Sequence, residues 1–229
     1  MAIQHRVSVT VRKKRRPARV KSPYISECLG AMGVRATVYV RSQLPSARGL
    51  GPAAAVPVAT LCAINDEFGK GLTREEVARQ AFEIEKKVQK GRASPTDTFV
   101  SSFGGVVLIQ GAEKRRLPPM NLPLVVGNSR VSHNTSLMVE KVGRERDRHP
   151  GIVNPVLDAI GALTQEALLQ LHDLRALGTL MNTNHALLDS LGVDPPALTR
   201  LALAARAAGA AAAPAPARGG EGGRTARAP

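Results

Sequence analysis

The 229-residue sequence has no tryptophan, and aromatic residues make up only 3% of it, so any core has to be built mainly from Ala, Val and Leu. Hydrophobic residues still account for 43% of the chain, which is enough for one large domain or two small ones. The two cysteines, Cys28 and Cys62, show no C-x-x-C spacing and no neighbouring His cluster. They therefore favour reduced thiols in a cytoplasmic protein over a disulfide framework or a zinc site.

The sequence also lacks long hydrophobic runs. Its longest apolar stretch, 53–64, is interrupted by Pro57 and Thr60 and is shorter than the roughly 20 residues that span a bilayer. The N-terminus does not contain the apolar region of a secretory signal. We therefore expect a cytoplasmic protein without a membrane partner.

Acidic residues are scarce only at the two ends of the chain. The formal net charge is +14, but residues 1–21 carry eight Lys or Arg and no acid, whereas 22–205 hold 20 basic and 17 acidic residues. The run R-K-K-R-R at 12–16 has no interleaved aromatic residues for base stacking. We do not expect nucleic acid as the partner, although a basic protein that binds it through residues 1–21 stays open as an alternative.

Hydrophobic patterning predicts strands and helices in both halves of the chain. Strands are predicted at 6–11, 34–40, 104–111 and 122–127. Helices are predicted at 52–67, 73–90, 155–171 and 174–191, with one more after Asp194-Pro195-Pro196. Residues 91–100 are expected to form a loop and 116–123 a linker. The mixture predicts an α+β chain with a domain boundary near residue 118.

One helix and one segment without structure stand out. Thr73 and Glu76 have the spacing of a capping box, and Gly91 is a typical helix terminator. Residues 207–229 contain none of Val, Ile, Leu, Met, Phe or Tyr. Because such a segment buries too little apolar surface to offset its ordering entropy, we expect 209–229 to be a disordered tail.

Three features are candidates for chemistry. The turn Gly49-Leu50-Gly51 precedes a predicted helix, whose backbone N–H groups bind phosphate without any side chain, but a purely structural turn fits equally. Asp97 is either a proton acceptor or a turn-forming residue. Glu85 is either a Mg²⁺ ligand or part of a solvated helix face. The isolated His133 and His185 have no metal-ligand spacing.

Five segments together resemble the archaeal mevalonate kinases of the GHMP kinase superfamily. P-S-A-R-G-L-G-P-A-A-A-V-P-V-A-T at 45–60 is similar to the family's phosphate loop, and E-K-K-V-Q-K-G-R-A-S-P-T-D-T-F-V-S-S-F-G-G at 85–105 to its second conserved region. The other three are L-P-L-V-V-G-N-S-R-V-S-H-N-T at 122–135, D-A-I-G-A-L-T-Q-E-A-L at 158–168 and A-L-G-T-L-M-N-T-N-H-A-L-L-D-S-L-G-V at 176–193.

The resemblance implies a two-domain GHMP-kinase-like fold. It implies an N-terminal ATP-binding α+β domain at 1–118 that lacks the family's first strands. It also implies a ferredoxin-like C-terminal domain at 119–208 that lacks its last strands. The implied reaction transfers the γ-phosphate of ATP to the primary hydroxyl of mevalonate in isoprenoid synthesis. A homodimer is compatible with it.

The resemblance also assigns roles to residues. Asp97 takes the place of the catalytic aspartate, and Glu85 that of the Mg²⁺ ligand if Lys90 is a one-residue insertion. The implied phosphate-binding residues are Pro45, Ser46, Ala47, Arg48, Gly49, Leu50, Gly51, Pro52, Ala53, Ala54 and Ala55.

The sequence departs from the family pattern in three places. The family's opening P-G-K-x-x-L-x-G-E-H segment and its glycine-rich third motif are not present, and a reading-frame change near residue 209 would explain the latter. Pro52 and Ala53 replace the two serines of the phosphate loop, so one backbone donor and one hydroxyl are missing. An inactive homologue or gene fragment therefore stays open beside the kinase.

Overall fold

A computed structural model describes residues 2–3, 5–14, 21–43, 52–91, 93–111, 113–120, 122–127, 135–214 and 223–227. The chain divides into two compact units. Unit 1 consists of Met1–Pro45 and Gly51–Pro119, and unit 2 of Ser46–Leu50 and Met120–Pro229. Within the ranges described, none of the helices combines the length and hydropathy that a bilayer crossing requires.

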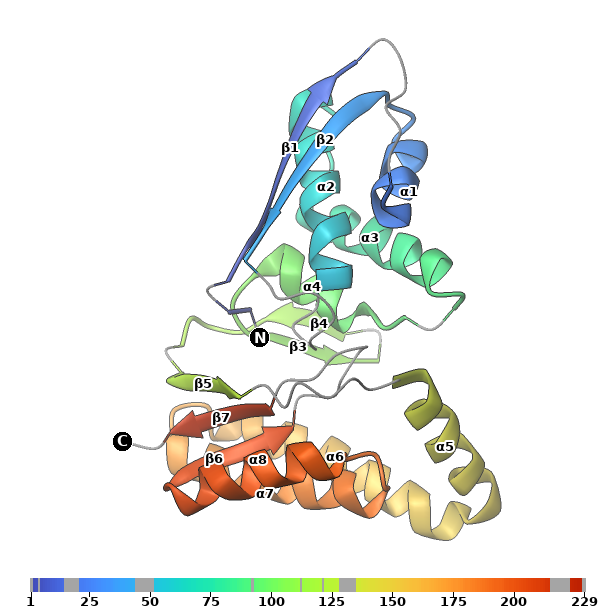
Figure 1. The fold of residues 1–229 in the computed structure, drawn as a ribbon. Coiled ribbons are helices and arrows are strands. Elements are labelled where there is room, and N and C mark those ends of the chain that lie inside the picture. The colour runs from blue at the N-terminus through green and yellow to red at the C-terminus, as the bar shows by residue number, and fades with distance from the viewer. Residues whose placement is uncertain are drawn as a thin grey trace. The chain divides into compact units, whose positions relative to one another are not determined.

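Unit 1 places helices against an antiparallel pair of strands (Figure 1). Its elements in chain order are β1 (Val7–Lys13), α1 (Pro23–Ala31), β2 (Ala36–Ser42), α2 (Pro52–Phe68), α3 (Arg74–Val88), α4 (Pro95–Phe103), β3 (Val107–Gln110) and β4 (Glu113–Arg116). Strands β1 and β2 pair from Val7 opposite Ser42 to Lys13 opposite Ala36. Helix α2 packs against β1 and also contacts α1, α3 and α4.

The core of unit 1 is built from small and branched aliphatic side chains, as the lack of aromatics predicts. Its buried members are Val11, Cys28, Met32, Ala36, Val58, Leu61, Ile64, Val77, Ala81 and Ile84. Burial raises the pKa of the Cys28 thiol to about 12, and the neighbouring Glu27 adds to the effect. The thiol donates a weak hydrogen bond to the Pro57 carbonyl at 3.8 Å, and the fully buried side chain otherwise packs as a small hydrophobic residue of the core.

Helix α2 confirms the helix predicted at 52–67. Pro52 is its first residue, where proline's missing N–H interrupts no helical hydrogen bond. Pro57 lies five residues further on, inside the helix, and removes the bond to the carbonyl of residue 53. The hydroxyl of the buried Thr60 donates to the Val56 carbonyl at 2.8 Å, so this polar group is satisfied within its own helix.

Helix α3 begins with the predicted capping box. The Glu76 amide donates to the Thr73 hydroxyl at 3.2 Å, and the Thr73 amide donates to the Glu76 carboxylate at 2.8 Å. These bonds from the Thr73 backbone and hydroxyl lower the pKa of Glu76. The structure therefore confirms the start of this helix.

A few elements of the chain were predicted wrongly or missed. The segment around Asp97, expected to be a loop, contains helix α4, because Ser94 and Pro95 act as N-cap and first helical residue rather than as turn residues. The same Ser-Pro signal starts α1 at Pro23, which the periodicity did not indicate. Strand β4 and helix α5 were also missed; their charged residues hide the alternation and the apolar stripe.

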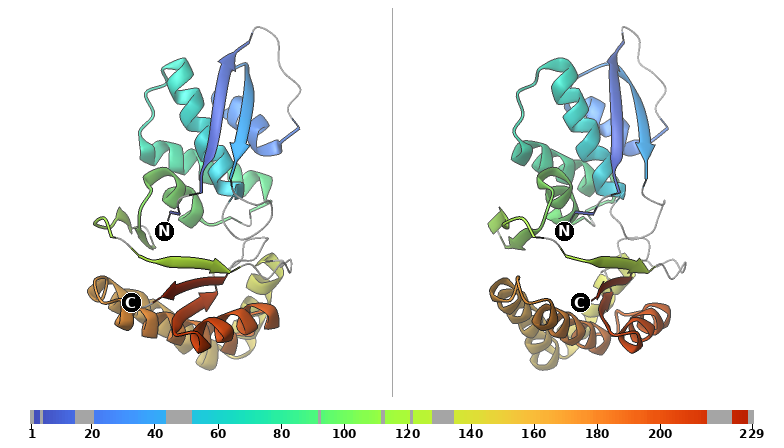
Figure 2. Two further views of the ribbon diagram at one scale, coloured as in Figure 1. Left: turned by 60° about the vertical axis from the view of Figure 1, so that its left-hand side comes forward. Right: turned by 90° about the vertical axis from the view of Figure 1, so that its left-hand side faces the viewer.

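Unit 2 is a three-stranded antiparallel sheet on a layer of helices (Figures 1 and 2). Its elements are β5 (Leu124–Gly127), α5 (Thr135–Arg148), α6 (Pro150–Leu169), α7 (Leu174–Ser190), α8 (Pro196–Ala207), β6 (Ala210–Pro214) and β7 (Gly223–Arg227). The strand order is β5-β7-β6, and α7 and α8 both contact β6. The predicted helices at 155–171, 174–191 and after Pro196 correspond to α6, α7 and α8.

Strands β6 and β7 differ from the expectation of a disordered tail. They fall within residues 209–229, and β7 pairs with β5 on one side and β6 on the other. Sheet formation joins backbone groups, so a segment of Ala, Gly, Thr and Arg can extend a sheet without contributing large apolar side chains. Composition indicates only how much side-chain surface a segment can bury, so it does not predict this backbone pairing.

A buried polar network joins α7 to α8. His185 is 3% exposed and its Nε2 contacts the Asp194 carboxylate, while Arg206 Nη2 lies 2.6 Å from its Nδ1. The Thr199 hydroxyl donates to the same Asp194 oxygen at 3.0 Å. The turn that leads into this network needs Gly192, because its φ is +64°, a conformation that glycine adopts without strain. His185 is thus part of the packing of unit 2.

Candidate functional site

Glu85 lies on the buried face of α3, and its side chain is 1% exposed. The residues that share this face are the apolar Val77, Ala78, Ala81 and Ile84. A carboxylate is costly to bury in such surroundings, so its presence in the core requires a specific reason. The alternative reading of Glu85 as part of a solvated helix face is therefore wrong.

A short chain of hydrogen bonds orients the Glu85 carboxylate. Gln89 Nε2 donates to Glu85 Oε1 at 2.8 Å and lies 3.3 Å from the hydroxyl of Tyr24 in α1. The first bond follows from the i, i+4 spacing on one helix, which places the two side chains on the same face. Gln89 and Tyr24 were not predicted from the sequence, although the helical spacing from Glu85 indicates Gln89.

Asp97 lies in the first turn of α4, where the helix dipole favours negative charge. Its side chain is half-buried. None of the hydrogen bonds and ion pairs between described residues includes the Asp97 carboxylate. The neighbouring Thr98 hydroxyl donates to the Pro95 carbonyl at 3.0 Å. Asp97 is thus placed by its helix and keeps its oxygens available.

The helix that carries Asp97 is anchored on both sides. Phe99 is 4% exposed, stacks on Phe103 at 5.8 Å between ring centroids, and carries Lys114 Nζ over its face at 5.0 Å. The Ser102 hydroxyl donates to the carbonyl of Arg74 in α3 at 2.6 Å. The Ser102 bond joins α4 to α3 and the Lys114 contact joins it to β4, so Asp97 lies on an anchored helix.

The predicted phosphate loop is only partly within the described residues. Pro45, Ser46, Ala47, Arg48, Gly49, Leu50 and Gly51 lie outside them. Pro52 begins α2, with Ala53, Ala54 and Ala55 in its first turn, and Ala54 is fully buried. Residues 53–55 therefore present backbone N–H groups at a helix start, the group that binds phosphate in many proteins.

Three helices bring these elements together. Helix α2 contacts α3 and α4, and α3 contacts α4, so the start of α2, Glu85 and Asp97 belong to one packed group of helices within unit 1. Among the described residues there is no cluster of three or more His, Cys, Asp or Glu side chains. The arrangement thus offers two separate carboxylates and a helix start, which suits a reaction on a phosphate group more than a metal site made of protein ligands alone.

Comparison with known families matches residues 19–105 to the GHMP kinases N terminal domain. Mevalonate kinase of Thermococcus sibiricus is 42% identical over 200 residues, which is 84% of this chain and 60% of the relative. Mevalonate kinase of Methanothermobacter thermautotrophicus is 32% identical over 249 residues and covers 100% of this chain and 82% of the relative. The chain thus spans about 60% of the length of the Thermococcus relatives that it matches.

Solved structures share the fold. L. major mevalonate kinase in complex with R-mevalonate superposes with a TM-score of 0.77 at 21% identity, over 98% of this chain and 78% of that one. The Lin0012 protein from Listeria innocua gives 0.85 at 16% identity, over 100% and 83%. At such identities the likeness concerns the fold alone, and it confirms the predicted α+β GHMP-kinase-like architecture.

Proposed function

The chain belongs to the mevalonate kinase family of the GHMP kinases, and from that premise we propose that it transfers the γ-phosphoryl group of ATP to the primary hydroxyl of mevalonate. The observation that carries the proposal is the packing of α4, with Asp97 in its first turn, directly on α3, whose buried face holds Glu85. The names of the relatives support the choice of substrate. The reaction would serve isoprenoid synthesis in the cytoplasm.

Asp97 is the proposed catalytic residue. Its carboxylate accepts the proton of the substrate hydroxyl while that oxygen forms a bond to the γ-phosphorus. The bond from the γ-phosphorus to the bridging oxygen breaks, and ADP leaves with the electron pair. Phosphoryl transfer depends mainly on the position of the reacting groups and on stabilisation of the charge in the transition state. An aspartate fixed on an anchored helix provides the position that this step requires.

Glu85 is the proposed ligand for Mg²⁺. The ion is usually held by one or two carboxylates together with substrate phosphates, so a single buried glutamate fits its needs. Bound Mg²⁺ neutralises negative charge on the phosphates. The role of the chain is to hold the Glu85 carboxylate in one orientation, which the hydrogen bond from Gln89 does.

Residues 45–55 are the proposed ATP phosphate loop. Ala53, Ala54 and Ala55 would act through their backbone N–H groups, which need no hydroxyl. Pro52 has no N–H and Ala53 no hydroxyl, so this chain holds the phosphates with fewer donors than a loop with two serines. We assign 1–118 to the ATP-binding domain and 119–208 to the C-terminal domain of the family, and we propose a homodimer as the assembly to test.

A coupled assay for ADP formation with mevalonate and Mg²⁺-ATP tests the proposal. We expect Asp97→Asn to lower kcat by about 10²–10⁴, the usual contribution of a positioned acid or base. The matched control is Asp66→Asn, which removes an exposed carboxylate from α2 of the same unit and should leave the rate unchanged. Equal rates for the wild type and Asp97→Asn would contradict the assignment of Asp97.

An inactive homologue is the second candidate, and the Pro52-Ala53 pair favours it. A titration of the wild type with ATP separates the two. Measurable ATP affinity with turnover supports the kinase. Binding of ATP without any mevalonate-dependent ADP formation would show that the fold has kept the phosphate loop and lost the reaction.

A further inference from the structure

Unit 1 contains a hollow of about 430 Å³ at the end of α2 opposite the predicted phosphate loop. It is lined by Lys13, Lys14, Gly33, Val34, Arg35, Phe68 and Lys70. From Pro52 to Phe68 the helix rises about 24 Å, at 1.5 Å per residue. The hollow is therefore separate from the ATP site proposed above.

Three chain segments converge on this hollow. Lys13 ends β1 opposite Ala36 of β2, and the Lys14 amide continues the pairing with a bond of 3.1 Å to the Arg35 carbonyl. Gly33, with φ at +63°, turns the chain from α1 toward β2. Phe68 is the last residue of α2, and Lys70 follows it. The cations thus come from secondary-structure ends that backbone hydrogen bonds hold in place.

The hollow carries four cations and no acid among its lining residues. None of the ion pairs found between described residues includes Lys13, Lys14, Arg35 or Lys70. The adjacent carboxylate, Glu67, accepts the backbone amide of Lys13 at 3.3 Å. Lys13 Nζ instead lies over the Phe68 ring, 5.2 Å from its centroid. The positive charge is therefore concentrated where a ligand would enter.

We propose that this hollow is a second anion site, which binds a small organic molecule carrying two or three phosphate groups. Four cations around one hollow repel one another, and a multivalent anion relieves that repulsion more than a single carboxylate does. The volume falls within the usual range for small-molecule sites, about 300–1,000 Å³. Phe68 and Val34 supply an apolar wall for the organic part.

Binding of sodium tripolyphosphate, measured by isothermal titration calorimetry at low salt, tests the site. We expect Arg35→Gln and Lys70→Gln each to weaken binding roughly three- to tenfold, and the double variant to weaken it further. Affinity should also fall steeply as salt rises from about 0.05 to 0.2 M, because the screening length shortens to about 7 Å.

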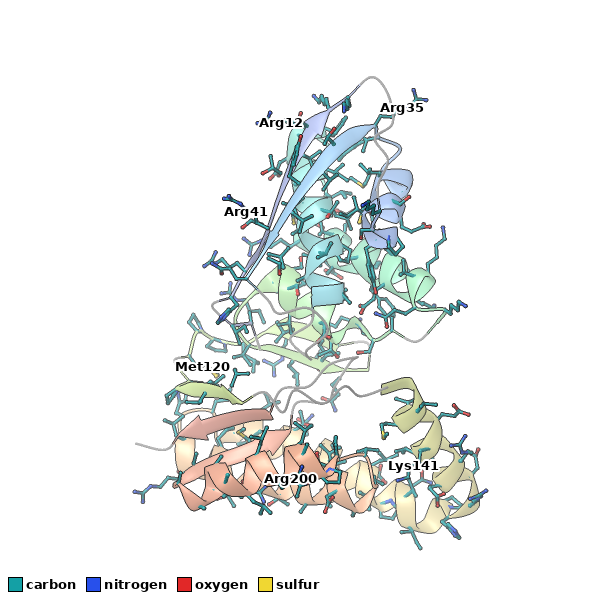
Figure 3. The ribbon with its side chains drawn as sticks, in the orientation of Figure 1. Arg12, Arg35, Arg41, Met120, Lys141 and Arg200 are labelled. Atoms are coloured by element: carbon teal, nitrogen blue, oxygen red, sulfur yellow. The ribbon has the colours of Figure 1, made fainter. Side chains whose placement is uncertain are left out.

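Arg41→Gln is the matched control. Arg41 is an exposed cation of the same strand pair, but it pairs opposite Ser8, about 20 Å along β2 from Arg35 at 3.3 Å per residue. Figure 3 shows Arg12 and Arg35 at one end of the strand pair β1–β2 and Arg41 further along it. We expect Arg41→Gln to bind tripolyphosphate as the wild type does.

Three outcomes would overturn the proposal. Unchanged affinity in Arg35→Gln and Lys70→Gln would place the anion elsewhere, including the phosphate loop. An equal loss in Arg41→Gln would mean that the whole basic surface attracts anions without a site. Tighter binding of a duplex oligonucleotide than of tripolyphosphate, lost equally in all variants, would identify a nucleic-acid surface. All variants alter exposed side chains, and circular dichroism checks that each is folded.

Discussion

Replacing the buried Glu85 by glutamine should make the protein more stable and less active. The side chain is 1% exposed, and burial of an ionised carboxylate carries a penalty of several kcal/mol even after relaxation. For the ionised form that a Mg²⁺ ligand must have, the bond from Gln89 at 2.8 Å returns about 1.5–3 kcal/mol. Glutamine keeps the shape and accepts the same hydrogen bond without the charge.

The expected gain is about 1–2 kcal/mol in the free energy of unfolding, because the desolvation penalty exceeds the difference between a charged and a neutral acceptor. For a chain of this size each kcal/mol raises Tm by about 2–4 °C. Thermal unfolding followed by far-ultraviolet circular dichroism measures the shift. In the coupled assay at limiting Mg²⁺, Glu85→Gln should lose at least tenfold in rate, in line with losses at metal sites.

Glu83→Gln is the control for this experiment. Glu83 lies on the same helix but is exposed, so its replacement should change stability by less than about 0.5 kcal/mol and leave the metal dependence intact. A Glu85→Gln protein that melts more than 2 °C below the wild type and keeps its Mg²⁺ response would refute the reasoning. Glu85 would then be a structural carboxylate of the core.

Two further predictions concern other parts of unit 1. At about pH 8, a thiol reagent should label Cys62 slowly and leave Cys28 unmodified until the protein unfolds, because burial raises the pKa of both thiols, that of Cys28 to about 12, but only Cys62 is exposed; mass spectrometry of the native protein reads this, and rapid double labelling would contradict it. Folding lowers the pKa of Glu76 below its ordinary 4.5, so its stabilising effect is complete above that pH and disappears as the pH falls through the lowered value. The urea midpoints of the wild type and Glu76→Gln should therefore differ near pH 6 and converge near pH 3; a constant gap would locate the effect outside the carboxylate.

The elements that sequence reasoning predicted are those with strong local signals. The capping box of α3 is decided by Thr73 and Glu76 alone, and the apolar composition of 52–67 leaves few alternatives to a buried helix. Helix α4 was hidden because Ser94-Pro95 reads equally as a turn and as a helix start. Only its packing on α3 decides between them, and a single sequence does not show that contact.

The candidate site was predictable as a set of residues but not as an arrangement. Family resemblance indicated Asp97 and Glu85, whose roles stay predictions. The burial of Glu85 was not predicted, since the neighbouring Lys86 and Lys87 suggested an exposed helix face. The basic hollow could not be predicted from the sequence for a different reason. Its cations are spread over residues 13–70, and the pairing of β1 with β2 and the packing of α2 on β1 bring them together.

The bond between Tyr24 and Gln89 gives this protein a built-in optical reporter. The chain has two tyrosines and no tryptophan, so no indole takes up tyrosine emission by energy transfer. Tyr39 is 58% exposed, whereas the Tyr24 hydroxyl lies 3.3 Å from the amide that holds Glu85. A Tyr39→Phe protein would fluoresce from Tyr24 alone. Its emission would then follow events at the Glu85 carboxylate directly, without an attached dye.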